Sequence, residues 1–217
     1  MKNLKSIVLA GSRGIGGSIS SRLGEISDVY SYSSSQVDTS KKQSVLEFLD
    51  EHESGTDVLV LNTGGPPAID FFEIDDETWE KYHNQLFLNF CRILQNIHIN
   101  DGGFVFLVSS FNIKEPNPKL ILSNAYRMAF VSVFKSLSKV YADRKISFIN
   151  IAPGPIKTDR LNSLVEDMEA FEDTMPMRYV AEPDEVGRFV KSIVEQDINY
   201  LSGVTINFDG ALSNYVL

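Results

Sequence analysis

A glycine-rich segment near the start of the chain has residue types suited to holding phosphate groups. The sequence AGSRGIGGSI, residues 10–19, follows an apolar run and leads into a helical pattern. Glycines permit a tight turn and a close backbone approach to a pyrophosphate, whose charge then meets free N–H groups at the helix start. The position after a strand favours a dinucleotide site over an ordinary strand-to-helix turn. The expected contacts are Gly11, Ser12, Arg13, Gly14, Ile15 and Gly16.

The residues at the end of the second expected strand distinguish between the dinucleotides NAD and NADP. An acidic residue there would bind the ribose hydroxyls of NAD, but residues 31–35 are rich in serine. Arg13 can pair with the 2′-phosphate of NADP, and Ser33 or Ser34 can donate hydrogen bonds to it. The pattern predicts NADP(H) over NAD(H). The alternative for Arg13 is a solvated surface cation.

A third polar segment follows the strand-like run VLVL. It reads NTGGPP and contains Asn62, Thr63 and Gly64. In open parallel sheets, ligands bind outside the carboxyl ends of the strands. We therefore expect these three residues to contact the cofactor.

These motifs need a sheet to position them, and the sequence indicates one. Apolar runs near residues 6–10, 28–33, 57–61, 104–110, 146–152 and 204–208 alternate with helical patterns at 78–97, 120–141 and 185–194. This alternation predicts an α/β fold, a doubly wound parallel sheet with helices on both faces. Residues 1–217 are expected to form a single domain.

The crossover after the second strand is predicted to be shortened. Only a few polar residues, 33–36, separate that strand from Val37 and Asp38. A parallel crossover needs about a dozen residues. The sheet should therefore lack one strand and its connection beside the second strand.

Composition limits the partners. Twenty basic and twenty-nine acidic residues give a formal charge of −9, which is a poor match to nucleic acid or an anionic membrane surface. The lone Cys91 excludes an internal disulfide, and a cytoplasmic location is expected. The three histidines have no metal-ligand spacing, so no metal site is predicted. A small-molecule substrate is expected.

The segments SRGIG, LNTGG, LVSS, INIAPGPIKTD and LSGVTINFDGAL, in this order, resemble the short-chain dehydrogenase/reductase family over nearly the whole chain. The resemblance implies a Rossmann-type fold, a nicotinamide cofactor and hydride transfer to or from a carbonyl or alcohol carbon. More narrowly, GGPP, SNAYR and PGPIKTDR resemble an atypical subgroup of that family.

The family's catalytic tyrosine and lysine are four residues apart, and YADRK matches that spacing with Tyr141 and Lys145. This match is a coincidence, because Tyr141 lies too far beyond Ser110 and too close to Pro153 for the family pattern. The family positions fall instead on Ser123 and Arg127. A serine hydroxyl is much less acidic than a phenol, and arginine keeps its charge, so this pair cannot relay protons as tyrosine and lysine do.

Several groups remain candidates to protonate the alkoxide: Ser110, which matches the family's catalytic serine, Ser123, Tyr126 or a water molecule. Tyr126 can share a helix face with Ser123, and the alternative for Tyr126 is a core or interface aromatic. Arg127 is expected to bind the cofactor ribose. The family's helical asparagine aligns with Leu86, while His83 and Asn84 are expected at the surface or an interface.

The resemblance assigns further cofactor contacts. Pro153, Gly154, Ile156 and Thr158 match positions that hold the nicotinamide ring and carboxamide, and Asp38 matches an aspartate that contacts adenine. Asp38 can also act as a helix N-cap. Residues 158–180 correspond to the family's mobile substrate lid.

Three functions fit this sequence. The leading one is an NADP-dependent oxidoreductase with an altered proton donor. The second is a non-catalytic nucleotide-binding sensor or assembly subunit, which the loss of tyrosine, lysine and asparagine favours. The third is a different reaction on the same scaffold, such as epimerisation. The family pattern also indicates a homodimer or homotetramer.

Overall fold

Within residues 4–215 there are six strands and eight α-helices, and at least one helix separates each strand from the next, as the apolar pattern predicts. The computed structural model describes residues 4–215. The strands are β1 (Leu4–Leu9), β2 (Ser27–Tyr32), β3 (Thr56–Leu61), β4 (Ile99–Val108), β5 (Ser147–Pro153) and β6 (Val204–Phe208). The helices are α1 (Gly14–Leu23), α2 (Lys42–Asp50), α3 (Asp76–His83), α4 (Asn89–Asn96), α5 (Ile121–Val140), α6 (Asp159–Asn162), α7 (Met168–Thr174) and α8 (Pro183–Glu195).

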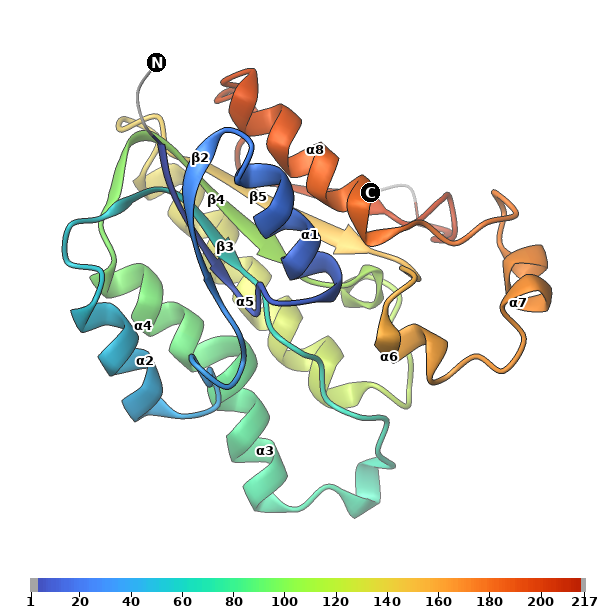
Figure 1. The fold of residues 1–217 in the computed structure, drawn as a ribbon. Helices are drawn as coiled ribbons and strands as arrows, with labels where there is room; N and C mark the ends of the chain where they lie inside the picture. Colours follow the sequence, from blue (N-terminus) through green and yellow to red (C-terminus); the bar gives the residue numbers. More distant parts are fainter. Residues whose placement is uncertain (1–3, 216–217) are drawn as a thin grey trace.

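All six strands are parallel and lie in one sheet with the order β2-β1-β3-β4-β5-β6 (Figure 1). Every residue of β3 and β5 is buried, because these central strands are covered on both faces. The edge strand β2 is only partly buried or exposed along its length. The predicted Rossmann-type, doubly wound α/β fold is confirmed.

The shortened crossover is also confirmed. Residues 33–41 form turns and bends, and the chain then passes through α2 and enters β3 on the other side of β1. Within residues 4–215, no strand pairs with the outer edge of β2. The missing strand follows from the length of the connection, because a few polar residues cannot span a parallel crossover.

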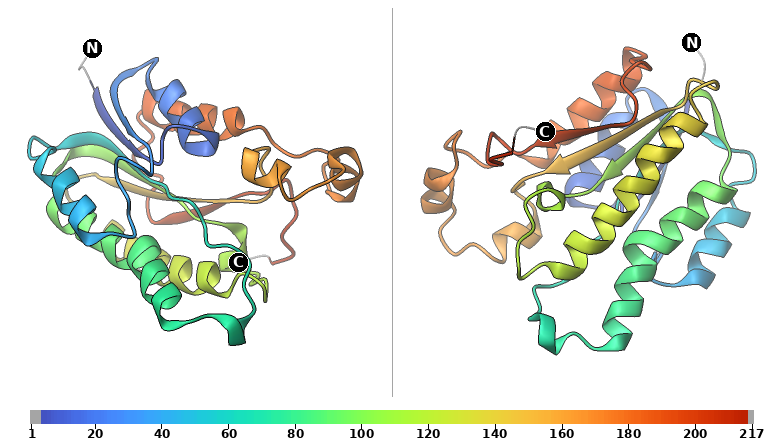
Figure 2. Two further views of the ribbon diagram at one scale, coloured as in Figure 1. Left: turned by 60° about the horizontal axis from the view of Figure 1, so that its bottom comes forward. Right: turned by 180° about the vertical axis from the view of Figure 1, so that it is seen from behind.

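The helices cover the two faces of the sheet unequally (Figure 2). On one face, α1 and α8 pack against the sheet through a cluster that includes Ile19, Val186 and Ile149. On the other, α2, α4 and α5 contribute Phe48, Phe90 and Phe130 to the second cluster. The short helices α6 and α7 lie outside both layers, beyond the carboxyl ends of the strands (Figure 1). No helix in residues 4–215 is long and apolar enough to cross a membrane.

The helix expected over residues 78–97 contains an irregular turn. Between α3 and α4, the segment Asn84–Leu88 is π-helical. A π turn holds an extra residue, which rotates the faces of the helix on its two sides relative to each other. It leaves Leu86 buried in the core and directs the neighbouring Gln85 toward the loop after β3.

A buried histidine packs beneath the edge strand. The side chain of His52 is 3% exposed, its Nε2 lies 2.6 Å from the Tyr32 hydroxyl, and its Nδ1 makes no hydrogen bond. The rings of Tyr30, Tyr32 and Phe48 surround the imidazole. Burial, followed by repulsion from Lys5, lowers the pKa of His52.

His52 should make stability depend on pH in mildly acidic solution. The pKa of His52 is lower in the folded state than in the unfolded chain, where it is about 6.5. The contribution of neutral His52 to the free energy of unfolding is therefore fully present above about pH 6.5, and it is lost as the pH falls below that value. Denaturant unfolding of the parent should thus show a decreasing free energy of unfolding on acidification. His52→Phe should have a shallower decrease, whereas exposed His98→Gln should match the parent; equal slopes in all three would contradict this assignment.

Candidate active site

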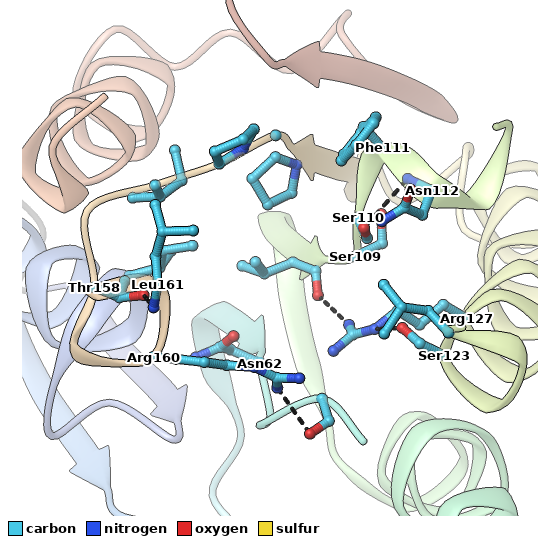
Figure 3. Close-up of a pocket in the computed structure, with 18 of the residues that line it drawn as sticks. Asn62, Ser109, Ser110, Phe111, Asn112, Ser123, Arg127, Thr158, Arg160 and Leu161 are labelled. Carbon is cyan, nitrogen blue, oxygen red and sulfur yellow. Dashed lines mark hydrogen bonds between the residues drawn. The ribbon is translucent and has the colours of Figure 1, made fainter. Parts of the chain in front are cut away.

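Two connected cavities lie at the carboxyl edge of the sheet. One, with a volume of about 370 Å³, extends from the ends of β4 and β5 to α6 (Figure 3). The other, about 500 Å³, extends from the glycine-rich loop past the end of β3. The two share Ile15, Asn62, Thr63, Gly65, Thr158 and Arg160, so they form one continuous groove.

The glycines of the first loop shape this groove without lining it. Gly14 has a φ of +54°, which favours glycine at the start of α1. A methyl group on Gly16 would lie 2.2 Å from the Ala10 carbonyl and 2.6 Å from Asn62 Nδ2. One on Gly11 would lie 2.3 Å from Ser31 Oγ. The loop therefore packs tightly on β1 and the β3 loop, while Ser12, Arg13 and Ile15 face the cavity.

The start of α1 is suited to an anion. Arg13 is the N-cap residue and its side chain makes no capping hydrogen bond, so the first N–H groups of the helix keep their capacity to donate. Arg13 and Ser34 line the same cavity. Ser33 does not line it, because its hydroxyl is 2.8 Å from both Ser35 Oγ and Gln36 Oε1 within a turn.

Asp38 lines the second cavity near its outer end. Its Oδ1 accepts hydrogen bonds from the Ser40 amide at 2.9 Å and hydroxyl at 2.7 Å, and Lys41 Nζ lies 3.3 Å from Oδ2. Burial acts to raise the pKa of Asp38, but the bonds from Ser40 and Lys41 outweigh it and the pKa is lowered. Asp38 is thus an anionic acceptor at this end of the groove. It organises the turn before α2, although Lys41 is the N-cap.

Ser110, Ser123 and Arg127 all line the first cavity. Ser110 Oγ accepts a hydrogen bond from the Asn112 amide at 3.2 Å, and Ser123 Oγ accepts one from Arg127 Nε at 3.2 Å. Each hydroxyl keeps its proton for donation. Two hydroxyl donors beside a guanidinium can stabilise an oxyanion that forms in the cavity.

Arg127 is a buried cation held by neutral groups. Its Nη1 donates to the Val108 carbonyl at 2.9 Å and its Nη2 to the Thr63 carbonyl at 3.4 Å. Burial, and to a lesser degree the charge of Arg160, lowers its pKa to about 10, so it remains cationic at neutral pH.

The loop after β5 completes the groove. Pro153, Gly154, Ile156 and Thr158 line the first cavity. A methyl group on Gly14 would lie 3.3 Å from Thr158 Cγ2, so the two loops meet across the groove. Thr158 also caps α6 by accepting a hydrogen bond from the Leu161 amide at 3.4 Å.

Tyr126 and Tyr141 both lie outside the groove. The expectation that Tyr126 is a catalytic candidate is corrected by its position outside both cavities. Its hydroxyl donates to the Trp79 carbonyl at 3.3 Å, and its ring packs on Trp79 and His83. Its place on α5 turns it away from Ser123. Tyr141 packs on Phe148 at the amino end of β5, at the opposite edge of the sheet from the groove.

Some lining residues were not singled out from the sequence. Arg160 donates to the carbonyls of Gly65 at 2.8 Å and Pro66 at 2.7 Å. Gln85 Nε2 donates to Thr63 Oγ1 at 3.1 Å and to the Gly64 carbonyl at 2.7 Å. No local pattern marks either residue, since both contacts join segments far apart in the chain. Within residues 4–215, no group of three or more histidine, cysteine, aspartate or glutamate side chains forms a metal site.

The sheet order, the glycine-rich turn and the groove at the carboxyl edge define a protein of the Rossmann-type, doubly wound class. A family model described as Enoyl-(Acyl carrier protein) reductase matches residues 19–213. The chain therefore belongs to this family of short-chain dehydrogenases and reductases.

Similar proteins agree with the family. The chain is 27% identical over 167 residues to human Dehydrogenase/reductase SDR family member 4, a match that covers 72% of this chain and 59% of that protein. It is 26% identical to Glucose 1-dehydrogenase 2 of Bacillus subtilis, covering 97% and 95% of the two chains. The structure of L-sorbose reductase from Gluconobacter frateurii, complexed with NADPH and L-sorbose, has a TM-score of 0.85 at 20% identity and covers 100% and 98%. This structural likeness concerns the fold.

The close packing at Gly16 should be sensitive to one methyl group. Gly16→Ala introduces a contact with backbone that cannot move freely, and such overpacking costs about 1–3 kcal/mol. We expect a lower Tm for this variant in thermal melts without any ligand. Gly64→Ala is the control, because a methyl group there meets nothing within 4 Å. Equal melting of Gly16→Ala and the parent would show that the loop does not pack as described.

Proposed function

We propose that this chain is an NADP(H)-dependent oxidoreductase that transfers a hydride between the nicotinamide and a carbonyl or alcohol carbon. The observation that carries the proposal is the continuous groove, which begins at α1 and ends at Ser110, Ser123 and Arg127. The groove runs from the glycine-rich loop to the ends of β4 and β5, and this extent together with the tight glycine turn suits a dinucleotide. Family membership supports the reaction class.

The phosphate end of the groove supports the preference for NADP(H). Arg13 and Ser34 line it beside the end of β2, where the sequence has serines instead of a carboxylate. A guanidinium binds phosphate through charge-assisted, bidentate hydrogen bonds. In this proposal Asn62, Thr63 and Gly64 hold the central part of the cofactor, Asp38 the adenine end, and the loop from Pro153 to Thr158 the nicotinamide end.

Arg13 provides the test of cofactor choice. Calorimetric titration should show tighter binding of NADPH than of NADH by the parent. Arg13→Ala should weaken NADPH binding roughly ten- to a hundredfold, as expected for a lost charge-assisted contact, and change NADH binding little. An unchanged NADPH affinity in Arg13→Ala would remove this assignment.

The catalytic wall lacks the usual proton donor. When bound, the reduced nicotinamide would supply a hydride to the substrate carbonyl carbon. The carbonyl oxygen then becomes an alkoxide, which Ser110 and Ser123 can stabilise through hydrogen bonds and Arg127 through its charge. The alkoxide takes its proton from water, giving the alcohol. By the family resemblance, Arg127 matches the lysine position, and we propose that it contacts the nicotinamide ribose.

The lining of the first cavity predicts an unusual pH profile. Its only ionisable side chains within the described part of the chain are Arg127 and Arg160. Arginine side chains do not exchange protons as general acids near neutral pH, so kcat with NADPH and a carbonyl substrate should stay constant between about pH 6 and 9. Stopped-flow single-turnover rates test this. A rate that follows a group with a pKa in this range would reveal a proton donor from outside the cavity.

A non-catalytic nucleotide-binding protein is the second candidate. The same absence of a neutral-range proton donor from the lining residues favours it. Oxidation of bound NADPH in the presence of a broad panel of carbonyl compounds distinguishes the two functions. An enzyme would oxidise NADPH with at least one compound, whereas a sensor would bind NADPH without turnover. A homodimer or homotetramer remains our proposal for the assembly, on the family pattern.

A further inference from the structure

Two arginines face the first cavity from opposite sides, and neither has an acidic partner. Arg127 projects from α5 and Arg160 from α6, and both guanidinium groups point toward the same space (Figure 3). Within residues 4–215, neither forms a salt bridge with an aspartate or glutamate. Arg127 is only 8% exposed, so water screens its charge weakly.

The hydrogen bonds of both groups leave donors unused. A guanidinium has five N–H donors. Arg127 uses three of them, on Ser123, Val108 and Thr63, and Arg160 uses two, on Gly65 and Pro66. All these acceptors are neutral, so they do not offset the charge.

Gly65 lies between the two groups. A methyl group on it would lie 2.9 Å from Arg160 Nη1 and 3.7 Å from Arg127 Nη2. The like charges repel, as the lowering of the Arg127 pKa by Arg160 also indicates. This concentration of positive charge occurs in a chain with a formal charge of −9, which carries many carboxylates that could have paired with it. The arrangement fits an oxyanion that enters the cavity.

The oxyanion has two possible sources, the cofactor diphosphate and an acid group of the substrate. The proposed binding mode places the diphosphate against the start of α1, beside Ser12 and Arg13, whereas Arg127 lines only the first cavity and Arg160 lines both. Arg127 instead touches Ser123, which would hold the reacting carbonyl. The carbonyl and the acid group must then be close neighbours in the substrate.

The remaining walls define the rest of the substrate. They are mostly apolar and include Phe111, Leu120, Pro155, Ile156, Leu161 and Leu164. Such walls favour an uncharged, apolar substituent.

We propose that Arg127 and Arg160 form a carboxylate site, and that the substrate is a small oxo acid, or the corresponding hydroxy acid, with an apolar side chain. The inference rests on the proposed oxidoreductase function. In the reducing direction the carbonyl carbon gains the hydride of NADPH, the oxygen gains a proton from water, and the carboxylate is unchanged.

Binding to the NADP⁺-loaded protein tests the proposal without turnover, because an oxo acid cannot be reduced by NADP⁺. The probes are 4-methyl-2-oxopentanoate and its primary amide, which lacks the negative charge. Calorimetry should show the acid binding to the parent about tenfold more tightly than the amide or better. Arg160→Gln should weaken acid binding by about the same factor and leave the amide affinity unchanged. Because Arg160 also lines the second cavity, any loss of NADP⁺ affinity should be much smaller than the loss of acid affinity.

Two further variants control for charge and for folding. Arg160→Lys keeps the cation and should retain part of the preference for the acid. Arg188→Gln removes an exposed arginine on α8, far from the groove, and should behave like the parent. Arg160 is the tested residue because it is exposed, whereas removal of buried Arg127 can unfold the protein.

Equal binding of acid and amide by the parent would overturn the carboxylate site. So would a loss of NADP⁺ affinity in Arg160→Gln equal to the loss of acid affinity, since the arginines would then serve the cofactor diphosphate. If the parent binds neither NADP⁺ nor NADPH, the proposed function fails. The affinities of the acid and the amide are then compared on the protein without cofactor. Tighter binding of the acid by about tenfold supports the arginine site, and equal binding of the two rejects it.

Discussion

The burial of one positive charge organises the catalytic end of this protein. Arg127 joins three separate segments: the last carbonyl of β4, the carbonyl of Thr63 after β3, and Ser123 one helical turn earlier on α5. A buried guanidinium left without acceptors costs several kcal/mol, so each of these acceptors must stay in place for the fold to be stable. The same requirement fixes the distance between the wall that carries the serines and the loop that carries Thr63.

The architecture was largely readable from the sequence because its signals are local. Parallel strands covered on both faces appear as short apolar runs, and the turn residues Gly14 and Gly16 lie where only glycine avoids strain or overlap. The shortened crossover was also readable, since the number of residues after β2 limits what the chain can form. The position of Tyr141 followed from spacing, and the structure places it at the opposite edge of the sheet from the groove.

The residues that escaped prediction depend on contacts across the chain. Arg160 is close to Gly65 only because α6 folds back over the β3 loop, and Gln85 reaches Thr63 through a π turn that helical periodicity does not show. Tyr126 illustrates the reverse case. Its position three residues after Ser123 suggested a shared face, but the aromatic rings of Trp79 and His83 provide a better-packed environment for the phenol. The roles of the groove residues toward a ligand remain proposals.

The truncated sheet leaves β2 with a backbone edge that pairs with no other strand in residues 4–215. Such an edge is a template onto which an extended segment of another molecule can add by main-chain hydrogen bonds, a common route to aggregation. The protection available is modest: β2 is only six residues long and carries polar side chains such as Ser27 and Ser31. The absence of a strand beside β2 thus leaves this protein open to intermolecular strand addition. The polar side chains and short length of β2 oppose such addition.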